Sequence, residues 1–171
     1  MDRVGRIEYY IEIAQAVSRR STCLRRQYGA VAVVGDRIIS TGYNGSPKGH
    51  TNCCDKGSCW RQDQNIASGT MYERCMSVHA EANALVRSNF TDFTTSDNRV
   101  LYIAGWDLER DAKASALPCL MCRRVIVQCG INEVYATHDG GVYKSNPGMW
   151  AGYENDSEDE FIKNEWERIE L

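Results

Sequence analysis

The sequence lacks long hydrophobic runs, and it also lacks an excess of positive charge. No apolar stretch in the 171 residues approaches the roughly 20 residues that a membrane-spanning helix needs. Residues 1–6 lead into a charged amphipathic segment, without the apolar stretch of a secretory signal peptide. The net charge is −3, with acidic residues gathered over 154–160, so the surface would not attract a long polyanion. These absences predict a cytoplasmic protein that binds neither membranes nor nucleic acids.

Internal repeats are missing too, and the length suits one domain over residues 1–171 with a single core. The chain has eight cysteines. In a small secreted protein they would indicate disulfides, but in a longer chain without a signal they indicate metal binding.

Hydrophobic periodicity predicts alternating helices and strands. The expected helices span about residues 4–20, 79–88, 119–129 and 156–171, and the expected strands span 30–34, 37–42, 100–104 and 133–137. Residues 43–75 show little periodicity, which predicts a long ordered loop that is functional or held by a metal. The order helix, hairpin, helix, strand, helix, strand indicates a mixed sheet covered by helices.

Two short motifs predict a catalytic metal centre: His79-Ala80-Glu81 and Pro118-Cys119-Leu120-Met121-Cys122. One imidazole and two thiolates supply three ligands to a zinc ion, which leaves the fourth tetrahedral position for water. A structural zinc usually recruits four protein ligands and has no use for a carboxylate beside its histidine. We therefore expect His79, Cys119 and Cys122 to bind zinc, and Glu81 to exchange protons with the water.

Both motifs are predicted at helix N-termini. The unpaired N–H groups and the positive end of the helix dipole favour thiolate over thiol there. The three-residue step from Cys119 to Cys122 lets both sulfurs converge on one ion.

The His-x-Glu and Pro-Cys-x-x-Cys pattern resembles the zinc-dependent nucleoside and nucleobase deaminases. In the implied reaction, water attacks C4 of a cytosine ring while Glu81 passes a proton to N3. The same carboxylate then gives a proton to the departing amine, so ammonia leaves.

Further segments narrow the resemblance to the deoxycytidylate (dCMP) deaminase family of the cytidine deaminase-like superfamily. They are residues 23–31 and 42–49, Cys53-Cys54-Asp55, Cys59 and residues 72–79. The resemblance covers about residues 4–137 and leaves out an acidic C-terminal extension at 146–171. It implies a three-layer α/β/α sandwich with a mixed five-stranded sheet, and hydrolysis of dCMP to dUMP in pyrimidine deoxynucleotide metabolism.

The resemblance also assigns substrate contacts. Asn44 would bind the deoxyribose 3′-hydroxyl, although an Asn-Gly pair can also be a plain turn. Arg25 matches a phosphate-side position, and Arg26 could serve instead, because a guanidinium suits phosphate; the alternative is a solvated charge pair. Ala116-Leu117 stand where the family often has Thr or Ser, so base-edge contacts are expected from backbone groups.

Members of this family can carry a second, structural zinc. We expect its ligands to be Cys23, Cys53, Cys59 and Cys75, with Cys54 and His50 as substitutes. Four thiolates would close a tetrahedral site and anchor the 43–75 insertion, which lacks apolar residues. The alternative is a set of scattered reduced cysteines.

Two other functions compete with dCMP deamination. A tRNA adenosine deaminase or another cytosine nucleoside or nucleotide deaminase shares the zinc motifs, but a tRNA enzyme should be basic and would not need the Cys-rich insertion. A non-catalytic nucleotide-binding module is a further alternative, against which Glu81 argues. The resemblance also implies a homo-oligomer, from dimer to hexamer, and allosteric control by dCTP and dTTP.

Overall fold

The computed structural model describes residues 3–67, 69–88, 97–150 and 158–171. Its centre is a mixed seven-stranded sheet in the order β2–β1–β3–β5–β6–β7, with β4 paired to β3. Within the described ranges, β3 and β5 are the parallel pair and the other pairings are antiparallel. The strands are β1 (Arg26–Val34), β2 (Arg37–Tyr43), β3 (Arg99–Asp107), β4 (Ala112–Ala114), β5 (Glu133–His138), β6 (Gly141–Ser145) and β7 (Glu167–Ile169).

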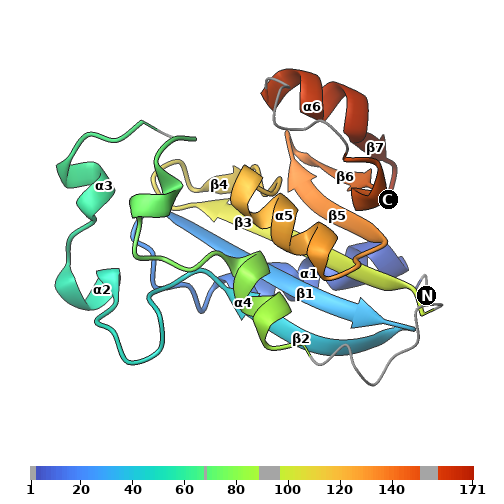
Figure 1. Ribbon diagram of the computed structural model, residues 1–171, viewed down its shortest axis with the longest axis horizontal. Coiled ribbons are helices and arrows are strands. Elements are labelled where there is room, and N and C mark those ends of the chain that lie inside the picture. Colours follow the sequence, from blue (N-terminus) through green and yellow to red (C-terminus); the bar gives the residue numbers. More distant parts are fainter. Residues whose placement is uncertain (1–2, 68, 89–96, 151–157) are drawn as a thin grey trace.

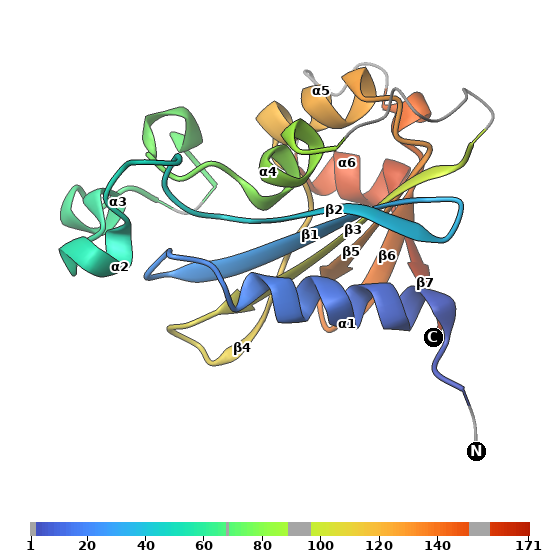
Figure 2. The same cartoon turned by 90° about the horizontal axis from the view of Figure 1, so that it is seen from below.

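Alternation along the central strands directs side chains into two separate cores, because successive residues of a strand point to opposite faces. Ala30, Ala32, Leu101 and Ile103 belong to one core, and Val31, Val33, Val100 and Tyr102 belong to the other. Helix α1 (Arg6–Ser18) covers the second core. Helices α4 (Ala80–Val86), α5 (Leu120–Gln128) and α6 (Glu158–Glu165) cover the first (Figures 1 and 2). The predicted three-layer α/β/α sandwich is confirmed.

The sheet is larger than the five strands expected. Strands β4 and β7 have three residues each and carry charged side chains, so their sequences show no strand pattern. The terminal helix predicted over 156–171 is also shorter, because α6 ends at Glu165 and residues 167–169 pair with β6 instead. The start of that predicted helix lies outside the described residues. Among the described residues, no helix is long and apolar enough to cross a bilayer.

The segment predicted as a loop over 43–75 contains three single turns: α2 (Cys53–Lys56), α3 (Trp60–Asp63) and the 3₁₀ turn η1 (Tyr72–Arg74). These turns lie beyond one end of the sheet, away from α6 (Figure 1). Helix α2 buries none of its residues, and α3 buries one, Arg61. Among the described residues of this segment, Cys59 is the buried apolar side chain, which is too little to form an apolar core.

Candidate active site

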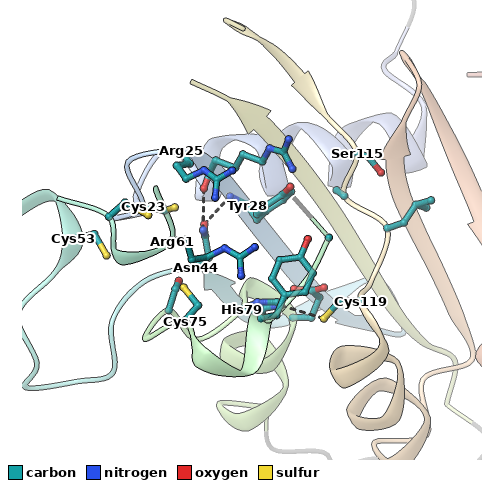
Figure 3. A pocket seen from close by; sticks show the side chains of 18 residues that line it. Cys23, Arg25, Tyr28, Asn44, Cys53, Arg61, Cys75, His79, Ser115 and Cys119 are labelled. Carbon is teal, nitrogen blue, oxygen red and sulfur yellow. Dashed lines mark hydrogen bonds between the residues drawn. The ribbon is translucent and has the colours of Figure 1, made fainter. Parts of the chain in front are cut away.

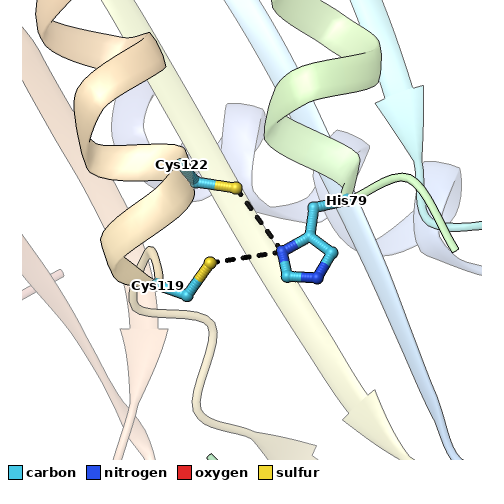
Figure 4. Close-up of side chains that lie close together, drawn as sticks. All are labelled: His79, Cys119 and Cys122. Atoms are coloured by element: carbon cyan, nitrogen blue, oxygen red, sulfur yellow. Dashed lines mark hydrogen bonds between the residues drawn. The ribbon is translucent and has the colours of Figure 1, made fainter. Parts of the chain in front are cut away.

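The two predicted zinc motifs meet between α4 and α5 (Figure 4). His79 is the N-cap of α4, Cys119 is the N-cap of α5, and Cys122 lies in the first turn of α5, which confirms that both motifs begin helices. The Sγ atoms of Cys119 and Cys122 each lie 3.4 Å from Nδ1 of His79. All three ligand atoms lie within 4.8 Å of one another.

This geometry fits a zinc ion. With Zn–S of about 2.3 Å and Zn–N of about 2.0 Å at a tetrahedral angle, a sulfur and a nitrogen ligand stand about 3.5 Å apart. The observed 3.4 Å is close to that separation, and it identifies Nδ1 as the ring nitrogen that faces both sulfurs. Three ligands leave one tetrahedral position open, as catalytic zinc sites do.

The two thiols also have the electrostatics of a metal site. The hydrogen bond from Cys122, together with the nearby His79 ring, lowers the pKa of Cys119 to about 4. The pKa of Cys122 is raised, because it donates that hydrogen bond and is buried. The protein alone therefore stabilises one thiolate, and a divalent cation would favour the second.

Glu81 lies beside this centre in the first turn of α4, and it is buried. Burial raises the pKa of its carboxyl group, and the His79 ring opposes part of this shift. A carboxylate whose pKa is moved toward neutrality can both accept and return a proton, which is what a general acid–base needs.

The segment Gly42–Gly45, of sequence Gly-Tyr-Asn-Gly, holds α4 against the sheet, and with it His79 and Glu81. Asn83 of α4 donates a 2.8 Å hydrogen bond to the carbonyl of Tyr43. Gly45 forms a backbone bridge with Val78, the residue before His79. Gly42 sits directly under α4: a Cβ there would lie 2.3 Å from backbone atoms of both Ala80 and Ala84.

Gly42→Ala should therefore push α4 away from the sheet. Overpacking of this kind typically costs about 1–3 kcal/mol, and we expect a comparable loss in the free energy of unfolding, measured in urea, together with lower activity. Gly5→Ala is the control, because a Cβ at Gly5 meets nothing within 4 Å. Equal stability of the two variants would contradict the close approach.

A cavity of about 330 Å³ opens beside His79, Glu81 and Cys119 (Figure 3). The substrate-binding candidates Asn44, Arg25 and Arg26 also line it. Its volume is in the range of small-molecule sites, and its lining is rich in polar and charged side chains.

The family of the chain follows from comparison with known proteins. Residues 5–138 match the model of the cytidine and deoxycytidylate deaminase zinc-binding region. The chain belongs to this family. It is 37% identical to the Schizosaccharomyces pombe deoxycytidylate deaminase over 126 residues, which are 74% of this chain and 35% of that relative. It is 34% identical to the Mycobacterium phage D29 deoxycytidylate deaminase over 139 residues, which are 78% of this chain and 95% of the phage protein.

The fold agrees with this assignment. The apo crystal structure of the cyanophage S-TIM5 dCMP deaminase matches this deaminase-family chain with a TM-score of 0.50 at 29% identity, covering 75% of this chain and 79% of that one. The chain spans 35% of the length of the two yeast relatives that it matches.

The two arginines predicted as phosphate contacts lie in different surroundings in this deaminase-family chain. Nε of Arg26 pairs with Oδ2 of Asp107 at 3.2 Å, and the Asp107 side chain is only 7% exposed. Burial raises the pKa of Asp107, but hydrogen bonds from the backbone N–H groups of Arg110 and Glu109 and the charge of Arg26 outweigh it, so the pKa is lowered overall. Arg26 is thus held by a carboxylate, whereas Arg25 lines the cavity and appears in no described ion pair.

Asn44 is buried and bound to β1 by both ends of its amide. Its Oδ1 accepts from the backbone N–H of Tyr28 at 2.7 Å, and its Nδ2 donates to the carbonyl of Arg26 at 2.9 Å (Figure 3). The residue is therefore neither a plain turn nor a free polar group, because it fixes the end of β2 to β1.

The four cysteines expected to bind a second zinc, Cys23, Cys53, Cys59 and Cys75, all line the cavity, and Figure 3 shows Cys23, Cys53 and Cys75 at the end away from Cys119. Burial raises the pKa of Cys53, and the other three thiols raise it further. Of the substitutes, Cys54 is exposed. Within the described ranges, His79, Cys119 and Cys122 form the one group of three or more possible ligands that converge to within 4.8 Å. The structure gathers the four cysteines without bringing them to ligand distance.

Tyr28, Arg61 and Tyr72 are among the cavity residues that had no predicted role. The ring of Tyr72 meets the His79 ring edge-on, with 5.3 Å between centroids. Tyr28 and Tyr72 lie in segments that carry the family resemblance, so a signal existed for them. Arg61 lies in the insertion, and no sequence pattern indicated its burial.

Proposed function

We propose that this chain catalyses the zinc-dependent hydrolytic deamination of dCMP to dUMP, with release of ammonia. The observation that carries the proposal is the buried Glu81 beside a three-ligand His/Cys/Cys centre, at a cavity of about 330 Å³. The relatives named deoxycytidylate deaminase, including a phage protein matched over 95% of its length, support this substrate.

His79, Cys119 and Cys122 would hold the zinc ion. When bound, zinc supplies a Lewis acid that brings the pKa of a bound water close to neutrality. The Glu81 carboxylate would accept a proton from the attacking water and pass it to N3 of cytosine as the water oxygen bonds to C4. It would then take the proton of the new C4 hydroxyl and deliver it to the amino group, so that the C4–N bond breaks, ammonia leaves and C4 keeps a carbonyl oxygen. Its burial keeps bulk water away from these transfers.

Asn44 and Arg25 would bind the rest of the nucleotide. A primary amide has two N–H groups, so Asn44 can keep its hydrogen bonds to β1 and donate the second N–H to the deoxyribose 3′-hydroxyl. Arg25 is the better phosphate candidate of the arginine pair, because Asp107 already holds Arg26. The Ala116 N–H donates to the carbonyl of Thr137 at 2.7 Å, so a base-edge contact at this position would use the Ala116 carbonyl.

The proposal is tested by ammonia release from dCMP, CMP, deoxycytidine, cytidine and dCTP, and by deamination of a tRNA anticodon stem-loop. We expect the highest kcat/KM for dCMP. Conversion of adenosine in the stem-loop, without turnover of the cytosine substrates, would establish the tRNA deaminase instead. Nucleotide binding without any turnover would establish the non-catalytic module.

We also propose the second, structural zinc at Cys23, Cys53, Cys59 and Cys75. Their place in the lining of one cavity, and the effect of the other three thiols on the pKa of Cys53, support it. The insertion has no apolar core, and ordering its backbone costs about 1–2 kcal/mol per residue. A closed thiolate site would offset part of this cost.

Elemental analysis should accordingly find close to two zinc ions per chain. Cys59→Ser or Cys75→Ser should remove one and lower the melting temperature, while the catalytic ion stays. Cys129→Ser, at the C-cap of α5, is the matched control and should retain both. A fully active wild-type protein with a single zinc would show that these four cysteines do not bind a metal ion.

The remaining proposals concern organisation and regulation. We propose a single-domain homo-oligomer of the cytoplasm that responds to dCTP and dTTP. Apolar side chains exposed on α4 and α5 support association: Val86 is 82% exposed, and Leu120, Met121 and Val127 are 38–46% exposed. Burying such side chains in an interface is favourable. Light scattering with and without the two nucleotides tests both points.

A further inference from the structure

Arg61 of α3 is a buried cation without a described counter-charge. The residue is 5% exposed. Its Nη1 donates to the carbonyl of Met71 at 3.0 Å and its Nη2 to the carbonyl of Ala67 at 2.8 Å, and the guanidinium lies 5.0 Å from the centre of the Tyr72 ring. All of these partners are neutral. The ion pairs among the described residues involve Arg6, Arg26 and Lys144, and none involves Arg61.

A buried charge that lacks an opposite charge is costly, so buried arginines are normally paired with an anion. The two carbonyls and the Tyr72 ring reduce this cost, but they do not neutralise the guanidinium. An arginine has five N–H donors, of which these contacts use two. The remaining donors can still form the paired hydrogen bonds that a guanidinium makes to phosphate oxygens.

The position of Arg61 indicates which anion is missing. Arg61 lines the same cavity as His79 and Glu81, and Figure 3 shows it reaching into that cavity. Tyr72 connects the two ends of this arrangement, because its ring contacts both the Arg61 guanidinium and the His79 ring. The Tyr72 side chain thus lies between the Arg61 guanidinium and the His79 ring.

We infer that Arg61 is a specificity-determining residue that binds the 5′-monophosphate of the substrate. The inference rests on the proposed deamination of a cytosine nucleotide and adds the residue that selects the nucleotide over the nucleoside. Arg25 is more exposed and would act as a second, weaker phosphate contact. Because its two carbonyl contacts orient Arg61 before substrate arrives, little entropy is lost when phosphate binds.

The test compares kcat/KM for dCMP and for deoxycytidine in wild type, Arg61→Gln, Arg61→Lys and Arg74→Gln. Arg74 is the matched control, since it lies in the same insertion but is exposed and stacks over Trp60 at 5.1 Å. Charge-assisted hydrogen bonds are strong, so Arg61→Gln should lower the ratio of kcat/KM for dCMP to kcat/KM for deoxycytidine by about 10- to 100-fold. Arg61→Lys keeps the charge but cannot form the paired hydrogen bonds of a guanidinium, so it should lower this ratio less. Arg74→Gln should leave the ratio unchanged.

Several results would overturn the inference. If Arg61→Gln lowers both kcat/KM values equally, Arg61 only anchors the insertion. If it releases zinc without changing the ratio, Arg61 balances the charge of the cysteine cluster instead. If Arg61→Gln fails to fold, the test rests on Arg61→Lys. A folded Arg61→Lys protein with the wild-type ratio of kcat/KM values would contradict the paired hydrogen bonds from Arg61 to phosphate. A wild-type protein that deaminates no cytosine substrate would refute the proposed function itself, which separates that failure from the failure of Arg61.

Discussion

Replacing Glu81 by glutamine is expected to abolish most turnover while leaving the zinc content unchanged. The amide has nearly the shape of the carboxylate, but it cannot accept the proton of the water or hand it to the cytosine ring. General acid–base catalysis typically contributes about 10²–10⁴-fold. Glu81 would serve several proton transfers in one cycle, so we expect a loss of kcat toward the upper end of this range.

The measurement is kcat for dCMP alongside elemental analysis of zinc. Because Glu81 is not expected to ligate the metal, zinc should remain at His79, Cys119 and Cys122. Glu73→Gln is the control, since Glu73 is an exposed glutamate of η1, a few residues from His79. A zinc-loaded Glu81→Gln protein with near-normal kcat would contradict the role of Glu81 in proton transfer. Loss of zinc in this variant would show instead that the carboxylate supports the metal centre.

The parts of the fold that the sequence predicted are those with strong local patterns. The buried runs in β1, β3 and β5 are continuous and apolar, as expected of central strands covered on both faces. The metal motifs begin helices because their backbone and side-chain requirements are met within a few residues. Local signals of this kind need no knowledge of the rest of the chain.

Two of the features that escaped prediction depend on distant partners. Strand β7 reads Glu167-Arg168-Ile169, and only its pairing with β6 makes it a strand. Asn44 was predicted as a substrate contact, with a plain turn as the alternative, and its bonds to β1 were missed because they join residues 16 and 18 positions apart. Arg61 escaped prediction for a different reason: its partners, the carbonyls of Ala67 and Met71, are only 6 and 10 residues away, but the insertion has no periodic pattern that predicts how it folds around the guanidinium.

The C-terminal extension, which no sequence motif explained, packs against Arg123 of α5, the helix that carries Cys122. Phe161 of α6 is fully buried. Its ring lies under the guanidinium of Arg123, 3.4 Å from the ring centroid, and Nε of Arg123 donates to the carbonyl of Pro118 at 2.8 Å. Pro118 precedes Cys119, so α6 supports the segment that positions Cys119. Trp150 adds an edge-on contact to the same ring, with 5.7 Å between centroids.

Phe161→Ala should consequently be among the most destabilising single substitutions in the chain. Truncating a buried phenylalanine typically costs about 3–5 kcal/mol, and this one also removes a desolvated cation–π contact. We expect a loss of this size in the free energy of unfolding of the zinc-loaded protein, measured in urea.

Ile162→Ala is the matched control, because Ile162 is the next residue of α6 and is only partly buried. If α6 merely covered the surface, both variants would lose similar, small amounts. A large loss confined to Phe161→Ala, with weaker zinc retention, would show that the extension braces the metal centre through Arg123 and Pro118.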